Sequence, residues 1–308
     1  MEHKTVLLNE GVDGLNIKPD GIYVDATLGG GGHSSLILSK LTTGHLYAFD
    51  QDDYAISVSK ERLDKIGHNY TIVRSNFVNI KEELAKLNVF KIDGIIYDLG
   101  VSSFQFDDFS RGFSYKENEI LDMRMDKNQK LDAKFIVNNY SLQELSNIIS
   151  KYGEEDFAYK IASNIVKTRE QKSIETTFDL VEIIKQSLPQ KVLNKKGHPA
   201  KKTFQALRIA VNDELNVFEK SLNQAIELLS IGGRVVVISF HSLEDRIAKH
   251  TFKELSTEKF VRGIPVSLGE PILKLITRHP ILPSDDEILE NSRSHSAKMR
   301  IAEKQKEA

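Results

Sequence analysis

The fold is decided by the stretch Ile22-Tyr-Val-Asp-Ala-Thr-Leu-Gly-Gly-Gly-Gly-His33, which leads through a segment of helical length to a second apolar run ending at Asp50. Four consecutive glycines, Gly29 to Gly32, remove every Cβ where the chain must turn sharply, so their N–H groups can face a ligand at the N-terminus of the next helix. An acidic residue about 20 positions beyond such a turn is where sheets of this kind hold ribose hydroxyls. The stretch therefore predicts the opening βαβ unit of an α/β sheet that binds a nucleoside.

The glycine spacing bears on which nucleoside cofactor is bound. The dinucleotide pattern G-x-G-x-x-G needs a third glycine at position 34 or 35, and both residues are serine. S-adenosylmethionine (AdoMet) carries no phosphate and needs only a close turn and an acid for its ribose. The pattern favours AdoMet, and the alternative of an NAD-dependent dehydrogenase is further weakened because no second nucleotide-binding half is visible.

Composition limits the function classes. The chain has 308 residues, of which 40% are hydrophobic, so it can bury one large core or two modest ones. Its net charge is −2, so any contact with nucleic acid must be local. No apolar run approaches the roughly 18 residues that span a bilayer, and the first residues lack a signal-peptide layout. We expect a cytoplasmic protein with no membrane partner.

The chain has no cysteine. Cysteine zinc sites are excluded, and we expect no metal. Methylation of carbon 5 of a pyrimidine generally needs a thiolate that first adds to the ring. If this protein methylates a pyrimidine, the target should therefore be an exocyclic nitrogen or an oxygen.

The alternation of strand-like and helical segments predicts a parallel sheet with helical crossovers. Stretches of helical length, such as 52–66 and 77–87, separate the first strand-like runs. The next convincing run, Arg234–Phe240, follows only after more than 130 residues, so a second unit must be inserted. The first four runs are Ile22–Asp25, His45–Asp50, Tyr70–Ser75 and Ile92–Leu99.

The inserted segment has helical patterns. Thr176-Thr-Phe-Asp179 matches a capping box ahead of an apolar face, and Pro189 ends that helix. A further helix, roughly 202–230, leads back to the sheet with Gly232-Gly233 at its end. We expect a sheet domain in two parts and an all-helical insert, with boundaries at 1–107, 108–206 and 207–308.

Residues that follow the strands are the candidates for chemistry, because ligands of open parallel sheets lie beyond the carboxyl ends of the strands. Asp98 ends the most apolar strand, where a carboxylate is costly unless a ligand or a donor meets it; it binds a ligand or caps the next turn. Phe77 either packs on a purine or is an ordinary core residue. His241 is functional or structural. The candidate segments are Gly29–His33, Asp50, Ser75–Phe77, Asp98–Ser103 and His241–Asp245.

A local excess of positive charge lies between residues 191 and 208, where no acid occurs. It is either a patch that faces phosphates or a solvated face. Three arginines elsewhere, Arg111, Arg124 and Arg300, are candidates to extend an RNA surface. The basic residues of the stretch are Lys191, Lys195, Lys196, Lys201, Lys202 and Arg208.

Eight motifs in order along nearly the whole chain resemble those of the bacterial small-subunit ribosomal RNA cytosine-N4 methyltransferases, the RsmH/MraW family. The most specific are Leu121-Asp-Met-Arg-Met-Asp126 and Ser239-Phe-His-Ser-Leu-Glu-Asp-Arg246. The others are Val6–Glu10, Asp25–His33, Asp98–Ser103, Arg111–Ser114, Tyr152–Glu155 and Phe204–Arg208.

The resemblance implies a Rossmann-like class I AdoMet-dependent methyltransferase with an inserted helical domain for substrate recognition. It implies N4-methylation of a cytidine in the decoding region of 16S rRNA. The family usually has proline before its glutamine, whereas this chain has Phe104, so the backbone before Gln105 is not fixed by a ring. The implied cofactor contacts are Gly31, Gly32, His33, Asp50, Phe77, Asp98 and Gln105.

As a mechanism we expect direct in-line methyl transfer, with Asp98 as the catalytic residue that accepts an N4–H bond. The alternative from another class is a non-catalytic RNA-binding assembly factor that keeps a relic AdoMet pocket. The sequence leaves open whether the substrate is free rRNA or the small subunit, whether the base is flipped or already unpaired, and whether the protein is a monomer or a homodimer.

Overall fold

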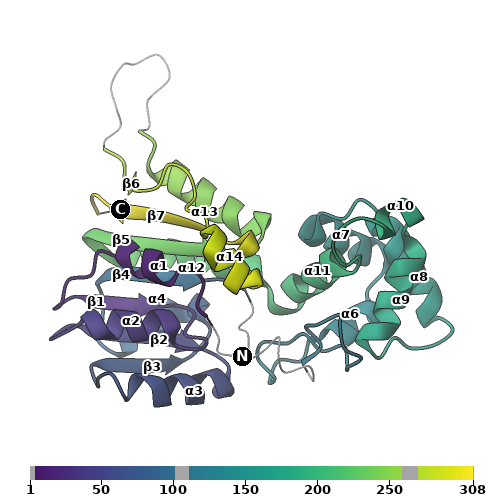
Figure 1. The fold of residues 1–308 in the computed structure, drawn as a ribbon, viewed down its shortest axis with the longest axis horizontal. Helices are drawn as coiled ribbons and strands as arrows, with labels where there is room; N and C mark the ends of the chain where they lie inside the picture. The colour runs from purple at the N-terminus through teal and green to yellow at the C-terminus, as the bar shows by residue number, and fades with distance from the viewer. Residues whose placement is uncertain (1–3, 101–110, 259–269, 308) are drawn as a thin grey trace. The chain divides into compact units, whose positions relative to one another are not determined.

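The computed structural model describes residues 4–100, 111–258 and 270–307, and the chain divides into two compact units. The sheet unit comprises residues 1–100 and 215–308, and the helical unit comprises residues 101–214 (Figure 1). The insert was predicted at 108–206, whereas this unit begins at 101 and ends at 214, after α11 (Lys201–Asn212). The single helix predicted over 202–230 is wrong. Asp213 adopts a left-handed conformation with φ of 50°, and α12 (Glu214–Leu228) begins after it.

The sheet unit contains a seven-stranded sheet in the order β3-β2-β1-β4-β5-β7-β6. The first five strands in this order pair in parallel, whereas β7 runs antiparallel to β5 and β6 antiparallel to β7. The predicted Rossmann-like α/β fold is confirmed, and the two strands at the antiparallel edge were not predicted. The strands are β1 (Ile22–Asp25), β2 (His45–Asp50), β3 (Tyr70–Arg74), β4 (Ile92–Asp98), β5 (Leu229–Ser239), β6 (Leu273–Leu275) and β7 (Lys298–Lys304).

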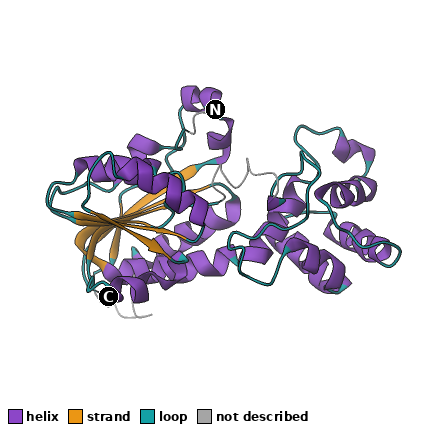
Figure 2. Cartoon of the chain, turned by 90° about the horizontal axis from the view of Figure 1, so that it is seen from below, coloured by secondary structure: helices purple, strands orange, loops and turns teal. Residues whose placement is uncertain are grey.

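Helices cover both faces of this sheet (Figure 2). One apolar cluster joins the strands to α4, α12 and α13, and a second joins the opposite face to α1, α2 and α3. The helical elements of the sheet unit are α1 (Leu8–Gly14), α2 (Gly32–Lys40), α3 (Asp53–Leu63), η1 (Phe77–Asn79), α4 (Ile80–Lys86), α12, α13 (Ser242–Leu255), α14 (Asp285–Glu290) and η3 (Ser292–Ser296).

The central strand β4 explains why its sequence is a continuous apolar run. Ile95 and Tyr97 lie in the first cluster, and Ile96 lies in the second, so successive side chains are buried on opposite faces. All three side chains are fully buried. This packing fixes the register of β4 between β1 and β5 and therefore the position of Asp98 at its carboxyl end.

The predicted glycine cap after the returning helix is wrong. Gly232 and Gly233 lie inside β5, where pairing with β4 shifts between Ile92 and Gly94. Gly232 has a φ of 81°, and a Cβ on Gly233 would lie 2.8 Å from the oxygen of Ser230, so both glycines serve an irregularity of the strand.

The helical unit has its own apolar core, built on residues such as Leu145, Ile161 and Leu207. The capping box predicted at Thr176 and Asp179 is confirmed at the start of α9. No helix in the described ranges of either unit is long and apolar enough to cross a membrane. The helices are α6 (Ala133–Asn139), α7 (Leu142–Gly153), α8 (Ala158–Arg169), α9 (Thr177–Ser187), α10 (Gln190–Leu193) and α11.

Candidate cofactor site and catalytic carboxylate

Three aspartates end three adjacent strands of the sheet. Asp25 is the last residue of β1, Asp50 of β2 and Asp98 of β4, and β1 pairs with both other strands. The carboxyl ends of parallel strands meet at one edge of the sheet, which is where open α/β sheets bind ligands. The three carboxyl groups therefore belong to one candidate site.

Asp25 organises the chain that follows β1. Its side chain is 1% exposed and accepts hydrogen bonds from Thr27 N at 3.0 Å and Ser34 Oγ at 2.7 Å. Thr27 Oγ1 in turn accepts a bond from Asp98 N at 2.7 Å. Asp25 was predicted only as part of a motif, although it ends a strand just as Asp50 and Asp98 do.

The glycine turn is held to its neighbours by its own backbone groups. Gly29 N donates to Asp50 Oδ2 at 2.9 Å, so the turn and the predicted ribose acid are in direct contact. On its carbonyl side, Gly29 O accepts a bond from Ser59 Oγ at 2.6 Å, and Gly30 O accepts one from Arg62 Nη1 at 3.2 Å. The turn is thus braced by α3 as well as by β2.

The backbone itself favours glycine at two of the positions that are predicted to contact the cofactor. Gly31 is the N-cap of α2 with a φ of 72°, and a Cβ there would lie 3.1 Å from Ser59 Oγ. A Cβ on Gly32 would lie 1.8 Å from Thr5 Oγ1. A side chain would strain the backbone at Gly31 and would displace Thr5 at Gly32, so both positions favour glycine before any ligand is considered. Their contact with a cofactor remains a prediction.

Asp50 keeps acceptor capacity for a ligand. Its Oδ2 accepts the bond from Gly29, and its Oδ1 accepts one from Asp52 N at 2.9 Å. A carboxylate has about four acceptor positions, so further positions are open for hydroxyl donors. Burial raises the pKa of Asp50 to about 6, because the charged form loses solvation.

Asp98 is the least satisfied of the three acids. Its Oδ1 oxygen is buried and has no hydrogen-bond partner within the described ranges, although a quarter of the side-chain surface is exposed. Burial, followed by the negative charges of Asp25, Glu244 and Glu287, raises its pKa well above the ordinary range. A buried acceptor without a donor is costly, so this carboxyl group is suited to meet a ligand.

His33 lies beside Asp98. Its Nδ1 is 3.6 Å from Asp98 Oδ2, and its side chain is 3% exposed. Burial lowers the pKa of His33 to about 4, an effect opposed by the backbone of Leu7 and Val6, so the ring is neutral at physiological pH. The buried Nε2 has no hydrogen-bond partner among the residues described.

Phe77, which was predicted to pack on a purine, contacts another aromatic ring within the protein. Phe77 begins η1, is partly buried and meets Tyr97 edge to face, with ring centroids 5.7 Å apart. Asn76 caps η1 by accepting a bond from Val78 N at 3.0 Å. Contact of Phe77 with an adenine ring stays a prediction, and Gln105 lies outside the described residues.

The segment after β5 has a structural role. His241 is the N-cap of α13, and the carboxylate of Glu244 accepts bonds from Phe240 N and His241 N. Asp245 binds Arg300 through both carboxylate oxygens, at 2.6 and 3.2 Å. The histidine and both acids thus open the helix.

The three arginines suggested for an RNA surface are engaged within the protein. Arg300 is the partner of Asp245, and its side chain is 11% exposed. Arg111 is buried and donates to the backbone oxygens of Arg124 and Met125. Arg124 binds Asp122 through two bonds at 2.8 and 2.7 Å. Their guanidinium groups support the structure, and a contact of these arginines with RNA remains a prediction.

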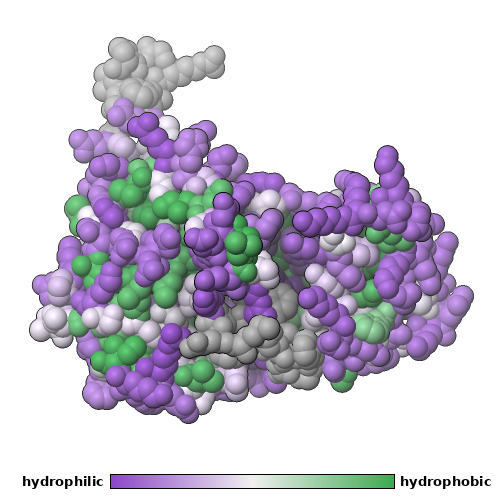
Figure 3. Space-filling view, viewed as in Figure 1, coloured by the Kyte–Doolittle hydropathy of each residue, from purple (hydrophilic) through white to green (hydrophobic). Residues whose placement is uncertain are grey.

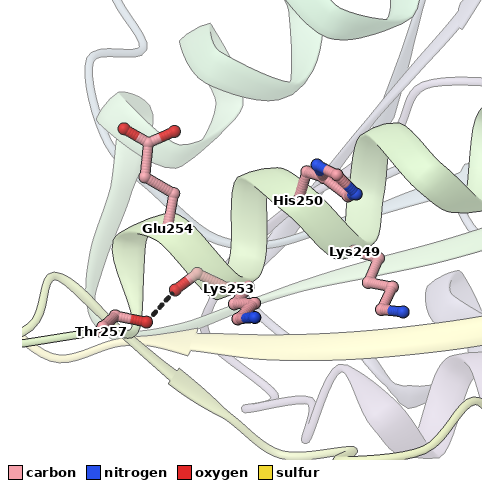
Figure 4. A pocket seen from close by; sticks show the side chains of 5 residues that line it. All are labelled: Lys249, His250, Lys253, Glu254 and Thr257. Carbon is pink, nitrogen blue, oxygen red and sulfur yellow. Dashed lines mark hydrogen bonds between the residues drawn. The ribbon is translucent and has the colours of Figure 1, made fainter.

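A surface depression lies on α13 and does not include Asp25, Asp50 or Asp98 (Figure 4). Its side chains come from one helix and the turn after it, and Thr257 Oγ1 donates to the backbone oxygen of Lys253 at 2.6 Å. None of the predicted site residues lines it, so it is not the candidate site. The lining residues are Lys249, His250, Lys253, Glu254 and Thr257.

The charge of the candidate site discriminates between cofactors. Burial raises the pKa of all three carboxyl groups toward the neutral form. When ionised, three acids at one edge attract positive charge and repel a diphosphate. AdoMet carries a sulfonium cation, whereas NAD carries a negatively charged pyrophosphate. The residues present fit AdoMet: Asp50 offers acceptors for its ribose, and the unpartnered Oδ1 of Asp98 offers one for a further donor.

Comparison with known proteins gives relatives along the entire chain. It is 56% identical over 310 residues to the ribosomal RNA small subunit methyltransferase H of Exiguobacterium sibiricum, with 100% of this chain and 99% of the relative covered. It is 54% identical over 307 residues to the enzyme of the same name from Oenococcus oeni, with 98% of each covered. An rRNA methylase structure from Streptococcus thermophilus has 12% identity and a TM-score of 0.46, with 99% of this chain and 100% of that chain covered. The assignment of the fold rests on the strand order of the sheet and not on this structural similarity.

A family model describes the chain as a whole. The model of the MraW methylase family matches residues 1–305. The chain therefore uses AdoMet as its methyl donor, and it belongs to the MraW methylase family.

Proposed function

We propose that this protein methylates N4 of a cytidine in the decoding region of 16S rRNA, within the cytoplasm. That it is a methyltransferase acting on ribosomal RNA of the small subunit follows from its family and from relatives at 54% and 56% identity. The position of the mark is the proposed part. The observation that carries it is the buried carboxyl group of Asp98, whose Oδ1 has no donor among the described residues.

Asp98 suits an exocyclic amino group as the target. The lone pair of cytosine N4 is delocalised into the ring, so the amino group must be turned before it can act as a nucleophile. A carboxylate that accepts one N4–H bond holds that orientation. The absence of cysteine argues against carbon 5, where covalent addition to the ring is needed.

The reaction requires positioning more than a strong base. When bound, AdoMet supplies an electrophilic methyl group and leaves as a neutral thioether. Asp50 and the glycine turn would hold its nucleoside portion, and Asp98 would orient N4 and then accept the proton that the methylated amino group sheds. Positioning of this kind can supply about 7–11 kcal/mol of the barrier reduction.

The raised pKa of Asp98 is compatible with this role. With no positive charge nearby, burial and the neighbouring acids favour the protonated carboxyl group. Positive charge bound at the same edge lowers this pKa and so favours the acceptor form of the carboxyl group. Neutral His33 adds no charge to the site that would compete with a cationic ligand.

The test uses purified protein, small ribosomal subunits or naked 16S rRNA, and AdoMet labelled in its methyl group. The product is digested to nucleosides, and we expect label in N4-methylcytidine. Asp98→Asn should reduce the rate at least about 100-fold, since it removes the charged acceptor. Glu61→Gln on the exposed surface of α3 is the matched control and should leave the rate unchanged.

Three outcomes decide against the proposal or part of it. Label in another nucleoside removes the N4 assignment. Full turnover by Asp98→Asn removes the role of its carboxylate. No transfer to either substrate, with RNA binding intact, favours the alternative of an assembly factor with a relic pocket.

A further inference from the structure

We propose that the exposed lysines of residues 191–202 form a docking surface for the phosphate backbone of the RNA substrate. This inference rests on the proposed function and deepens it by naming a substrate-binding surface in the helical unit. The lysine surface is defined as Lys191, Lys195, Lys196, Lys201 and Lys202, on α10, the turn after it and the first turn of α11.

No carboxylate neutralises the positive charge of this surface, although Lys202 Nζ donates to the backbone oxygen of Glu154 at 2.7 Å. All five side chains are exposed, and none lies within 4.0 Å of a carboxylate in the part of the chain that the structure describes. No acidic residue occurs between Glu182 and Asp213. In the same unit Lys134, Lys172 and Lys185 each pair with a carboxylate, at 2.7, 3.3 and 2.8 Å.

Arg208 lies in the same basic stretch of the sequence but does not belong to the surface. Its Nε and Nη2 atoms each donate to the carboxylate of Glu214 at 2.8 Å, and both side chains are largely buried. The surface therefore consists of lysines alone. Lysines act as point charges toward phosphate and need no paired geometry.

The turn that carries Lys195 and Lys196 is anchored at both ends. On one side, Val192 and Leu193 pack against the apolar core of the helical unit. On the other side, the ring of His198 stacks on Tyr115, with centroids 4.2 Å apart and planes within 10°. A surface held in this way loses less conformational entropy on binding than a free tail.

The start of α11 adds to the excess of positive charge. Lys201 and Lys202 occupy its first turn, which contains no acid, and the N-cap Ala200 offers no side-chain bond. Positive side chains at the positive end of a helix dipole are unfavourable. Lys202 Nζ meets the backbone oxygen of Glu154 at the end of α7, so the repulsion remains at Lys201. A phosphate bound beside Lys201 removes it.

The chemistry favours an RNA backbone over a protein or a membrane. No large apolar side chain between the lysines of residues 191–202 is exposed. The large exposed apolar side chains of the helical unit, such as Tyr159 on α8 and Phe178 on α9, belong to other elements. Interfaces with proteins and membranes rely on such side chains, whereas phosphate contacts rely on charge. Figure 3 shows a hydrophilic surface over α10, in the view of Figure 1.

The experiment measures binding of a decoding-region fragment of 16S rRNA to the full-length protein at several salt concentrations. The test variant combines Lys195→Ala, Lys196→Ala and Lys201→Ala. The matched control combines Lys151→Ala on α7 with Lys160→Ala and Lys167→Ala on α8. These are three exposed lysines of the same unit that also lack a carboxylate partner within the described ranges. Circular dichroism and thermal unfolding verify that both variants are folded.

We expect the test variant to bind at least about tenfold more weakly near 0.1 M salt and its log–log salt slope to fall by about 2, since each phosphate contact contributes about 0.7–0.9. The control should change affinity less than about twofold. An unchanged slope in the test variant overturns the proposal, and so does an equal loss in the control. A loss that appears only when ribosomal proteins are present also overturns it, because the partner is then a protein.

Failure of this inference is distinguishable from failure of the proposed function. Asp98→Asn should bind the fragment with the wild-type salt slope while losing methyl transfer. If the wild type binds RNA through the lysines but transfers no methyl group, only the proposed function fails. If it transfers methyl groups and the lysine variant keeps the wild-type KM for RNA, only the docking surface fails.

Discussion

At the scale of single residues, Asp50 makes binding at the donor site depend on pH. The donor site is the candidate site for the methyl donor AdoMet, formed by Asp25, Asp50, Asp98 and the glycine turn. Burial raises its pKa from 3.8 to about 6, so folding favours its protonated form. The protonated carboxyl group of Asp50 therefore contributes fully to stability below about pH 4, and this contribution is lost as the pH rises through about 6. Binding of a ribose has the opposite dependence, because hydroxyl donors prefer the ionised carboxylate as acceptor.

We predict that affinity for S-adenosylhomocysteine rises between about pH 5 and about pH 7, one unit on either side of the pKa of Asp50. The measurement is isothermal titration calorimetry at matched ionic strength. In Asp50→Asn the affinity should be weaker, and the step near pH 6 should disappear. Glu61→Gln serves again as the surface control. A step of equal size in Asp50→Asn would assign the titration to another group.

Residues at the ends of strands were predictable, because the apolar run and the turn that follows it are both local. Asp50 and Asp98 were identified in this way. The roles of the arginines were not predictable, since their partners are distant in sequence: Arg300 binds Asp245 across 55 positions. A sequence that shows an arginine does not show whether a carboxylate folds back onto it.

At the scale of elements, the start of α9 offers a test of a local signal. Thr176 Oγ1 accepts a bond from Asp179 N at 3.2 Å, and Asp179 Oδ2 accepts one from Thr176 N at 3.0 Å. We predict that Thr176→Ala costs about 1 kcal/mol of local stability. Hydrogen exchange at the first-turn amides of α9 should accelerate roughly fivefold. Ser150→Ala, an exposed position inside α7, should not accelerate exchange there; unchanged exchange in Thr176→Ala would show that the cap contributes nothing.

The elements that were predicted carry signals within a few residues. The ends of β1 and β2 match the predicted runs, and β3 and β4 each end one residue earlier than predicted. The break between α11 and α12 was missed because Asp213 stops a helix by its left-handed backbone, without glycine or proline. The strand β7 was missed because its pairing with β5 is set by tertiary contacts. Its alternation over Lys298 to Ile301 breaks at Ala302, and the strand ends in the buried Lys304.

At the scale of the whole molecule, the two units have separate cores. The two apolar clusters on the faces of the sheet contain residues of the sheet unit alone, and the third contains residues of the helical unit alone. The acids of the donor site and the glycine turn belong to the sheet unit, and the lysine surface belongs to the helical unit. The proposed binding of AdoMet and the proposed docking of RNA therefore belong to units with different cores.

This separation predicts where a bound donor stabilises the chain. At 100 times its dissociation constant, S-adenosylhomocysteine should add about 2.7 kcal/mol to the stability of the state that binds it. In hydrogen–deuterium exchange, protection should rise in the peptides of β1, the glycine turn and β2, while the peptides of α7 to α9 stay within error of the free protein. Asp50→Asn at the same ligand concentration is the control and should show a smaller increase. Equal protection across α7 to α9 would show that the two cores unfold as one, and donor binding would then have to be treated as a property of the entire chain.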